Sequence, residues 1–127
     1  KLTESASIMV VEDDPINMLL ISEVMRKMGF EVIKAVHGKE AIEKLPHCEP
    51  LLIFMDVNMP EMDGYEATRH IRNMADTCSS IPIIALTADA MKEDKDRCIA
   101  AGMNNFISKP FRLEEIESVL KEYILLT

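Results

Sequence analysis

The sequence predicts an α/β fold with one parallel sheet and helices on both of its faces. Five short segments rich in apolar residues alternate with five segments whose apolar residues recur at helical spacing. The central run, Leu51–Met55, has no polar break, which is typical of a strand buried on both faces of a sheet. Parallel strands need a crossover connection, usually a helix, so the alternation indicates helices packed on both sides of one sheet.

Length and composition indicate a single globular domain. The 127 residues are enough for one hydrophobic core; we expect residues 1–6 to be a polar tail or linker and 7–127 to form the domain. A net charge of -8 argues against direct binding to nucleic acid. No apolar run approaches the roughly 20 residues of a membrane span, so no membrane contact is expected of this domain.

The first strand and helix follow the expected tail. The unbroken apolar run Ile8–Val11 predicts a buried strand, which ends at three acidic residues. Asp14 suits the N-cap and Pro15 the first position of a helix that ends near Met28, with Gly29 as its C-terminal cap. Five apolar residues share one side of the helical wheel and are expected to face the core: Leu20, Ile21, Val24, Met25 and Met28.

Two further strands surround the second helix. Val32–Val36 is less apolar than the other strands and is expected at an edge of the sheet. Gly38–Leu45 is expected to be helical, and Leu51–Met55 to be the central strand.

Asp56 stands at the end of the central strand and is the first candidate for a functional residue. Pro60, with its locked φ, and Gly64, with its permissive φ, are expected to fix the shape of the loop that follows. In open α/β sheets the ligand crevice lies beyond the carboxyl ends of the strands. A carboxylate at this position would therefore form the floor of that crevice.

The rest of the chain continues the alternation. The expected elements are helix Tyr65–Met74, strand Ile81–Leu86 followed by Thr87, helix Ala90–Ala101 capped by Gly102, strand Asn105–Ser108 followed by Lys109-Pro110, and helix Arg112–Leu125. Met91, Cys98, Ile99 and Leu113 are expected to face the core.

The flavodoxin-like strand order 2-1-3-4-5 suits this pattern and places the first and third strands side by side. Glu12 and Asp13 would then lie within reach of Asp56. Three carboxylates in one crevice repel each other unless a cation or protons intervene, and hard oxygen ligands favour a divalent ion such as Mg²⁺.

The cysteines and histidines give no metal or disulfide pattern. Cys48, Cys78 and Cys98 are odd in number and widely spaced, so we expect free thiols in a reducing compartment. His37, His47 and His70 are expected to have no part in the function. The chain begins at Lys1 without Met, which suggests a segment of a longer protein or an edited N-terminus.

Five motif residues at the carboxyl ends of four strands resemble the receiver domain of two-component response regulators. They are the pair Glu12-Asp13, Asp56 in MDVNMPEMDG, Thr87 in ALTADA, and Lys109, followed by Pro110, in SKPF. The stretches VEDDPIN, ALTADAM and CIAAGMNNFISKPF look most like receivers fused to hybrid sensor histidine kinases. The resemblance covers nearly the whole chain.

The resemblance implies a role for each motif residue. Asp56 would take a phosphoryl group from a phosphohistidine, as a nucleophile that forms an aspartyl phosphate. Mg²⁺ would be held by Asp13, Asp56, the backbone carbonyl of Asn58 and, through water, Glu12. Lys109 would pair with one phosphoryl oxygen. The resemblance also implies a cis Lys109-Pro110 peptide bond, which would aim the Lys109 ammonium at Asp56.

Two residues are implied to form a conformational switch. The Thr87 hydroxyl would move to a phosphoryl oxygen, and Phe106 would change its packing in response. The family often has Tyr at this position, so an output that depends on a Tyr hydroxyl is in doubt for this chain.

The implied partner is a histidine kinase or a histidine phosphotransfer domain that donates the phosphoryl group. Ile16, Met18 and Leu19 would form an apolar docking patch at the start of the first helix, with Leu19 at its centre. The domain alone would catalyse only its own phosphorylation and dephosphorylation, although the full-length protein could be a histidine kinase. The implied location is cytoplasmic, including the cytoplasmic part of a membrane-anchored kinase; the oligomeric state has no signal in the sequence.

Several other functions share parts of this pattern. A flavodoxin-type electron carrier needs a Ser/Thr/Gly-rich phosphate loop after the first strand, where this chain has acidic residues. A haloacid-dehalogenase-like phosphatase needs a DxD motif, and Asn58 stands at its second position. A stand-alone response regulator and a pseudo-receiver that only binds proteins remain open, although the complete motif set disfavours the pseudo-receiver.

Overall fold

The computed structural model describes residues 6–59, 62–74, 76–88 and 92–124, and its sheet has the expected order. Five strands form one sheet ordered β2-β1-β3-β4-β5, in which every neighbouring pair is parallel. The strands are β1 (Ser7–Val11), β2 (Glu31–Ala35), β3 (Ile53–Asp56), β4 (Ile83–Thr87) and β5 (Asn105–Ser108). This confirms the predicted flavodoxin-like α/β topology.

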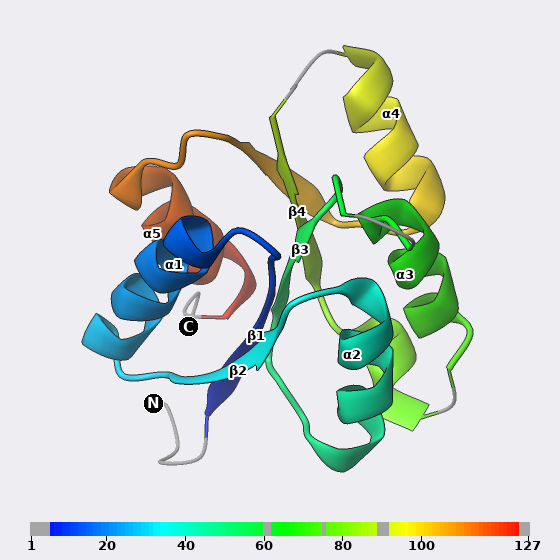
Figure 1. Ribbon diagram of the computed structural model, residues 1–127, viewed down its shortest axis with the longest axis horizontal. Coiled ribbons are helices and arrows are strands. Elements are labelled where there is room, and N and C mark those ends of the chain that lie inside the picture. Colours follow the sequence, from blue (N-terminus) through cyan, green and yellow to red (C-terminus); the bar gives the residue numbers. More distant parts are fainter. Residues whose placement is uncertain (1–5, 60–61, 75, 89–91, 125–127) are drawn as a thin grey trace.

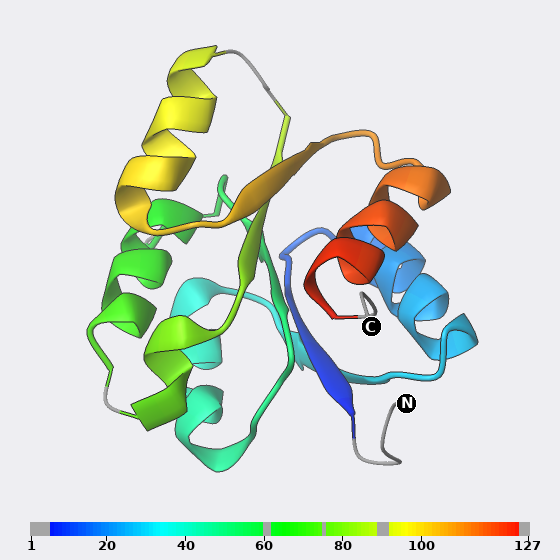
Figure 2. The ribbon, with the colours of Figure 1, turned by 180° about the vertical axis from the view of Figure 1, so that it is seen from behind.

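The helices cover both faces of the sheet. Figures 1 and 2 show α1 and α5 on one face and α2, α3 and α4 on the other. Their bounds are α1 (Pro15–Lys27), α2 (Gly38–Lys44), α3 (Gly64–Arg72), α4 (Lys92–Ala101) and α5 (Leu113–Tyr123), with short 3-10 helices η1 (Leu45–His47) and η2 (Asp76–Ser80). Among the described residues, none of these helices has the length and apolar character that crossing a membrane would require.

The sheet separates two hydrophobic cores. Side chains alternate across each strand, so Met9 and Val11 of β1 join the core beneath α2, α3 and α4, whereas Ile8 and Val10 join the core beneath α1 and α5. Phe54 of β3 is fully buried between the sheet and the α1/α5 layer. Because both faces are covered, the inner strands are buried along their whole length, as their apolar sequence predicts.

The predicted boundaries of α1 are confirmed. The Asp14 side chain accepts a hydrogen bond from the Ile16 N–H at 2.9 Å, and Pro15 occupies the first turn. Gly29 follows the helix with a φ of 94°, a conformation that favours glycine.

The side of α1 that faces the core is rotated by part of a helical turn from the side expected from the sequence. It runs through Met18, Ile21, Ser22 and Met25, which follow helical spacing. Met18 is only 8% exposed, so its expected place in a surface patch is wrong. Leu20 is 48% exposed, so its expected place in the core is wrong as well. The reason is that α1 meets both the sheet and α5, and the direction of contact cannot be read from the helix alone.

Three other residues expected inside are exposed. Leu51 precedes β3, which begins at Ile53, because the pairing of β3 with β1 begins at Met9 and Ile53. Ile99 lies on the outer side of α4, whose described core contacts come from Cys98 and Ala101. Leu113 is the first residue of α5 and is also exposed. Met91 and Pro60 lie outside the described residues.

The corrected orientation of α1 predicts unequal costs for two neighbouring truncations. Ile21→Ala removes a fully buried side chain and should lower the free energy of unfolding by about 2–5 kcal/mol. Leu20→Ala, the matched control one residue away, should change it by no more than roughly 0.5 kcal/mol. Urea unfolding of both variants measures the difference, and equal costs would mean that Leu20 is buried after all.

Candidate functional site

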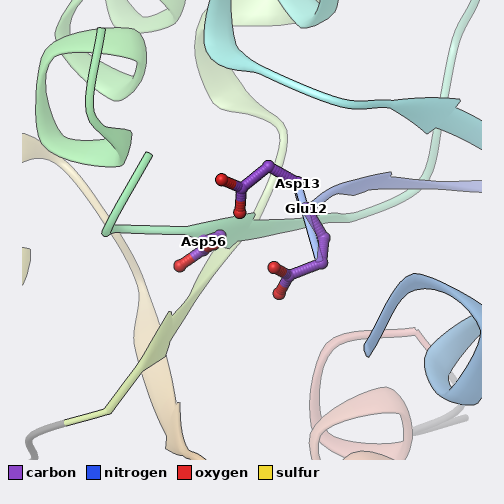
Figure 3. A group of neighbouring side chains, drawn as sticks. All are labelled: Glu12, Asp13 and Asp56. Atoms are coloured by element: carbon purple, nitrogen blue, oxygen red, sulfur yellow. The ribbon is translucent and has the colours of Figure 1, made fainter. Parts of the chain in front are cut away.

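Three carboxylates meet at the carboxyl ends of β1 and β3. Val11 of β1 pairs with Met55 of β3, so Glu12 and Asp13 leave the sheet beside Asp56. Figure 3 shows the three side chains at these two strand ends. One ligand oxygen from each lies within 4.8 Å of the others, as the strand order predicted.

Asp56 is buried and held at one carboxylate oxygen. It is 1% exposed, and its Oδ1 accepts hydrogen bonds from the Asn58 N–H at 3.0 Å and from Lys109 Nζ at 3.1 Å. Lys109 follows β5, and its own N–H donates to the Thr87 carbonyl at 2.8 Å. The Lys109-Pro110 peptide bond is cis, as expected. The Lys109 ammonium thus extends from the end of the edge strand β5 to the Asp56 carboxylate at the end of the central strand β3.

Glu12 is as deeply buried as Asp56 but less well paired. Its Oε2 accepts a hydrogen bond from the Asp14 N–H at 3.1 Å. Its Oε1 lies 3.4 Å from Lys109 Nζ, yet has no hydrogen-bond partner. Burial, together with the neighbouring Asp56, raises the pKa of Glu12 from 4.5 to about 7.

Lys109 is the charge that balances this cluster. Burial on its own would lower the pKa of Lys109, but the contacts with Asp56 and Glu12 outweigh burial and raise it. The ammonium therefore stays charged at neutral pH. One ammonium between two buried carboxylates leaves negative charge for a cation to neutralise.

The donor set suits a hard divalent cation. All three side chains offer carboxylate oxygens, one of which is a buried Glu12 atom without a hydrogen-bond partner. Asp13 is exposed, so water could complete an octahedral shell of the kind Mg²⁺ prefers. The part of the chain that the structure describes contains no other such acidic, His or Cys cluster. The role of the Asn58 backbone carbonyl as a further ligand stays a prediction.

The two expected switch residues lie on the neighbouring strands β4 and β5. Thr87 is buried at the carboxyl end of β4, the same end of the sheet as Asp56. Phe106 pairs with Ala85 and is half-buried, with Lys95 Nζ of α4 lying 5.1 Å from the centre of its ring. Their coordinated movement stays a prediction.

Two residues have structural roles that were not assigned from the sequence. His37, which was expected to have no part in the function, caps α2, because its Nδ1 accepts the Glu40 N–H at 3.0 Å while Glu40 Oε1 accepts the Val36 N–H at 2.7 Å. The glutamate three positions after the cap was the signal for this. Gly64 was expected to supply a permissive φ; it is instead the first residue of α3 and, unlike Gly29 and Gly102, has no positive φ. The three cysteines are free thiols, as expected.

Fold and site together define a parallel α/β domain with three carboxylates and one ammonium gathered at its strand ends. The family described as "Response regulator receiver domain" matches residues 8–121. The chain belongs to this family.

Curated relatives include both large kinases and a small regulator. The chain is 38% identical over 91% of its length to the sensor histidine kinase RcsC of Escherichia coli, of which it spans only 12%. It is 36% identical over 93% of its length to the polar-differentiation response regulator DivK of Brucella anthropi, of which it spans 95%. The chain thus spans about an eighth of the sensor kinase and nearly the whole length of the regulator.

Solved structures agree with this assignment. The receiver domain of the sensor histidine kinase PA1611 from Pseudomonas aeruginosa, with magnesium coordinated in its active-site cleft, is 37% identical, with a TM-score of 0.86 over 94% of this chain and 98% of that one. The receiver domain of Saccharomyces cerevisiae Ssk1, crystallised with the histidine phosphotransfer protein Ypd1, is 27% identical, with a TM-score of 0.88 over 99% of this chain and 93% of that one. The Glu12, Asp13 and Asp56 cluster is like a receiver magnesium site.

The raised pKa of Glu12 predicts a stabilising substitution. The pKa of Glu12 in the folded protein, about 7, exceeds its ordinary value of 4.5, so ionisation of Glu12 destabilises the Mg²⁺-free fold. The loss of stability grows as pH rises from about 4.5 to 7 and is complete above pH 7. Glu12→Gln should therefore raise the melting temperature of the Mg²⁺-free protein at pH 8, with little gain at pH 5. Glu23→Gln, on the exposed side of α1, is the control and should give no such pH-dependent gain. A Glu12→Gln variant less stable than the wild type at pH 8 would contradict this.

Proposed function

We propose that this receiver domain takes a phosphoryl group from a phosphohistidine onto Asp56, with Mg²⁺ as the cofactor. The observation that carries the proposal is one buried strand-end carboxylate that contacts Lys109 and lies beside two further acidic side chains. Receiver domains accept phosphoryl groups from histidine kinases and phosphotransfer proteins, which gives the reaction class.

In the proposed reaction, Asp56 attacks phosphorus in line with the departing imidazole nitrogen. The new bond joins a carboxylate oxygen to phosphorus, the P–N bond breaks, and the imidazole nitrogen keeps the electron pair and takes a proton from solvent. Both contacts to Asp56 go to Oδ1, so we assign the attack to Oδ2. Bound Mg²⁺ would neutralise charge on the transferring group.

The protein's own contribution is positioning and electrostatics. Lys109 Nζ is close enough to Asp56 to pair with an oxygen of the attached phosphoryl group. Thr87 ends the neighbouring strand, from which its hydroxyl would turn to another of these oxygens. Phe106, without a hydroxyl, would respond by packing alone. No side chain is required as a general acid, because a phosphohistidine imidazole is already a good leaving group.

Two protein contexts fit such a domain. We propose the receiver part of a hybrid sensor histidine kinase, which is supported by the identity to RcsC and by the motif details. A stand-alone response regulator is the second candidate, favoured by the match along nearly the full length of DivK.

We further propose that the donor docks on α1. Ile16, Leu19 and Leu20 are exposed and follow i, i+3, i+4 spacing, so they share one outward side of the helix. Ile16 lies in the first turn, which follows directly on the acidic end of β1, so this α1 patch adjoins the site. The patch replaces the one first expected, with Leu20 in the place of the buried Met18.

Asp56 is predicted to be the sole phosphoacceptor. Asp56→Asn removes the nucleophile and should abolish labelling by acetyl phosphate in Mg²⁺, measured by intact-protein mass spectrometry. The control is Asp63→Asn, because an asparagine at this N-cap position of α3 preserves the cap and leaves the site unchanged. Wild-type labelling should also disappear in EDTA. Phosphate mapped to Asp13 or to a serine would overturn the assignment.

The α1 patch predicts a defect that depends on the donor. Leu19→Glu should slow transfer at least tenfold from a phosphorylated histidine phosphotransfer domain that labels the wild type, because a charge replaces an apolar contact residue. Labelling by acetyl phosphate should be unchanged. Ile99→Glu, an equally exposed apolar position on α4, is the control and should affect neither donor. Equal losses with both donors would indicate damage to the site, and no loss would exclude Leu19 from the interface.

A further inference from the structure

Gly64 begins α3 directly against the backbone of the phosphoacceptor. A Cβ placed on Gly64 would lie 2.8 Å from Cα of Val57 and closer still to the carbonyl oxygen of Asp56. These are backbone atoms of a buried strand end, which cannot rotate away as a flexible side chain can. The missing side chain is therefore what allows the first turn of α3 to touch β3.

Hydrogen bonds hold Gly64 in this position from both sides. Its N–H donates to the Val57 carbonyl at 3.3 Å, which joins the start of α3 to the end of β3. Its carbonyl accepts the hydroxyl of Thr68, a fully buried residue one turn further on, at 2.7 Å. The first of these bonds joins α3 to the end of β3, and the second lies within α3 and fixes the first turn of the helix.

Helix α3 is also packed closely against α2, its neighbour on the same face of the sheet (Figure 1). A Cβ on Gly38, the first residue of α2, would be 2.9 Å from Cβ of Ala67 in α3. Ala67 is fully buried in this contact. A side chain added at Gly64 would therefore have to shift the first turn of a closely packed helix, the Asp56–Val57 backbone, or both.

The residues beside Gly64 carry the proposed chemistry. Asp56 supplies the reacting carboxylate, and Asn58, whose N–H holds that carboxylate at 3.0 Å, follows Val57 directly. Relief of the clash needs a displacement of more than roughly half an ångström, which exceeds the tolerance of a working catalytic constellation. Both the carboxylate and the Asn58 carbonyl would move with this segment.

We propose that Gly64 is a positioning residue, which lets α3 serve as the support that fixes Asp56 and the segment up to Asn58 for phosphoryl transfer and cation binding. The proposal rests on Asp56 being the phosphoacceptor. It assigns to Gly64 a steric role at the site in place of the backbone flexibility expected from the sequence.

The test compares two Gly→Ala substitutions. Gly64→Ala should lower the rate of acetyl phosphate labelling, per folded molecule, at least tenfold. Its affinity for Mg²⁺, titrated calorimetrically without any phosphoryl donor, should fall as well. Gly29→Ala is the matched control: it strains a backbone at φ +94° with no atom within 4 Å and lies far from the site, so it should reduce thermal stability but change neither rate nor affinity.

Thr68→Val tests the same support without a clash. It removes the hydroxyl that holds the Gly64 carbonyl while keeping the shape of the side chain, so rate and Mg²⁺ affinity should fall in the same direction by a smaller factor. A folded Gly64→Ala variant with wild-type rate and affinity would overturn the proposal. So would an unfolded Gly64→Ala variant combined with an unaltered Thr68→Val variant. If the wild type itself takes no label, the phosphoacceptor assignment fails, and the Mg²⁺ titrations still decide whether Gly64 positions the site.

Discussion

The structure depends on one electrostatic balance, the burial of like charges at the ends of two neighbouring strands. Glu12 and Asp56 are each only 1% exposed, and their mutual repulsion and desolvation oppose folding. Lys109 is within 3.4 Å of one and 3.1 Å of the other, and offsets part of this cost. The remaining cost appears as the raised pKa of Glu12. A fold that retains such a cluster maintains a site whose excess negative charge a cation can neutralise.

The parallel topology is what makes this balance possible. Lys109 follows β5, which lies at the opposite edge of the sheet from β2, yet it crosses β4 to reach the end of β3. The hydrogen bond from the Lys109 N–H to the Thr87 carbonyl fixes the start of that path. Because all strands run in one direction, their carboxyl ends place acidic, hydroxyl and ammonium groups at the same end of the sheet. Among the described residues, the other end of the sheet has no such cluster of acidic, His or Cys side chains.

The helices differ in how firmly they are attached. The side chain of Arg72 joins α3 to the chain beyond α4: its Nε donates to the Gly102 carbonyl at 2.8 Å and its Nη2 to Asn104 Oδ1 at 2.8 Å. Elsewhere α4 contacts its neighbours partly through cations, with Arg97 4.4 Å from the centre of the Tyr65 ring. The end of α4 is therefore anchored by hydrogen bonds at Gly102 and by the buried side chains of Cys98 and Ala101, to which the cation–π contacts are an addition.

The sequence alone determined the strand order, the convergence of Glu12, Asp13 and Asp56, and the caps at Asp14 and Gly29. Each depends on local rules: apolar runs set the strands, parallel crossovers set the topology, and caps follow from short-range hydrogen bonding. The tertiary structure decided which side of α1 is buried, so that Met18 went inward and Leu20 outward. It also decided that Gly64 is required for close packing. Both features depend on how closely two elements approach each other. That distance is set by packing between segments that are far apart in the chain, so the periodicity of a single segment cannot predict it.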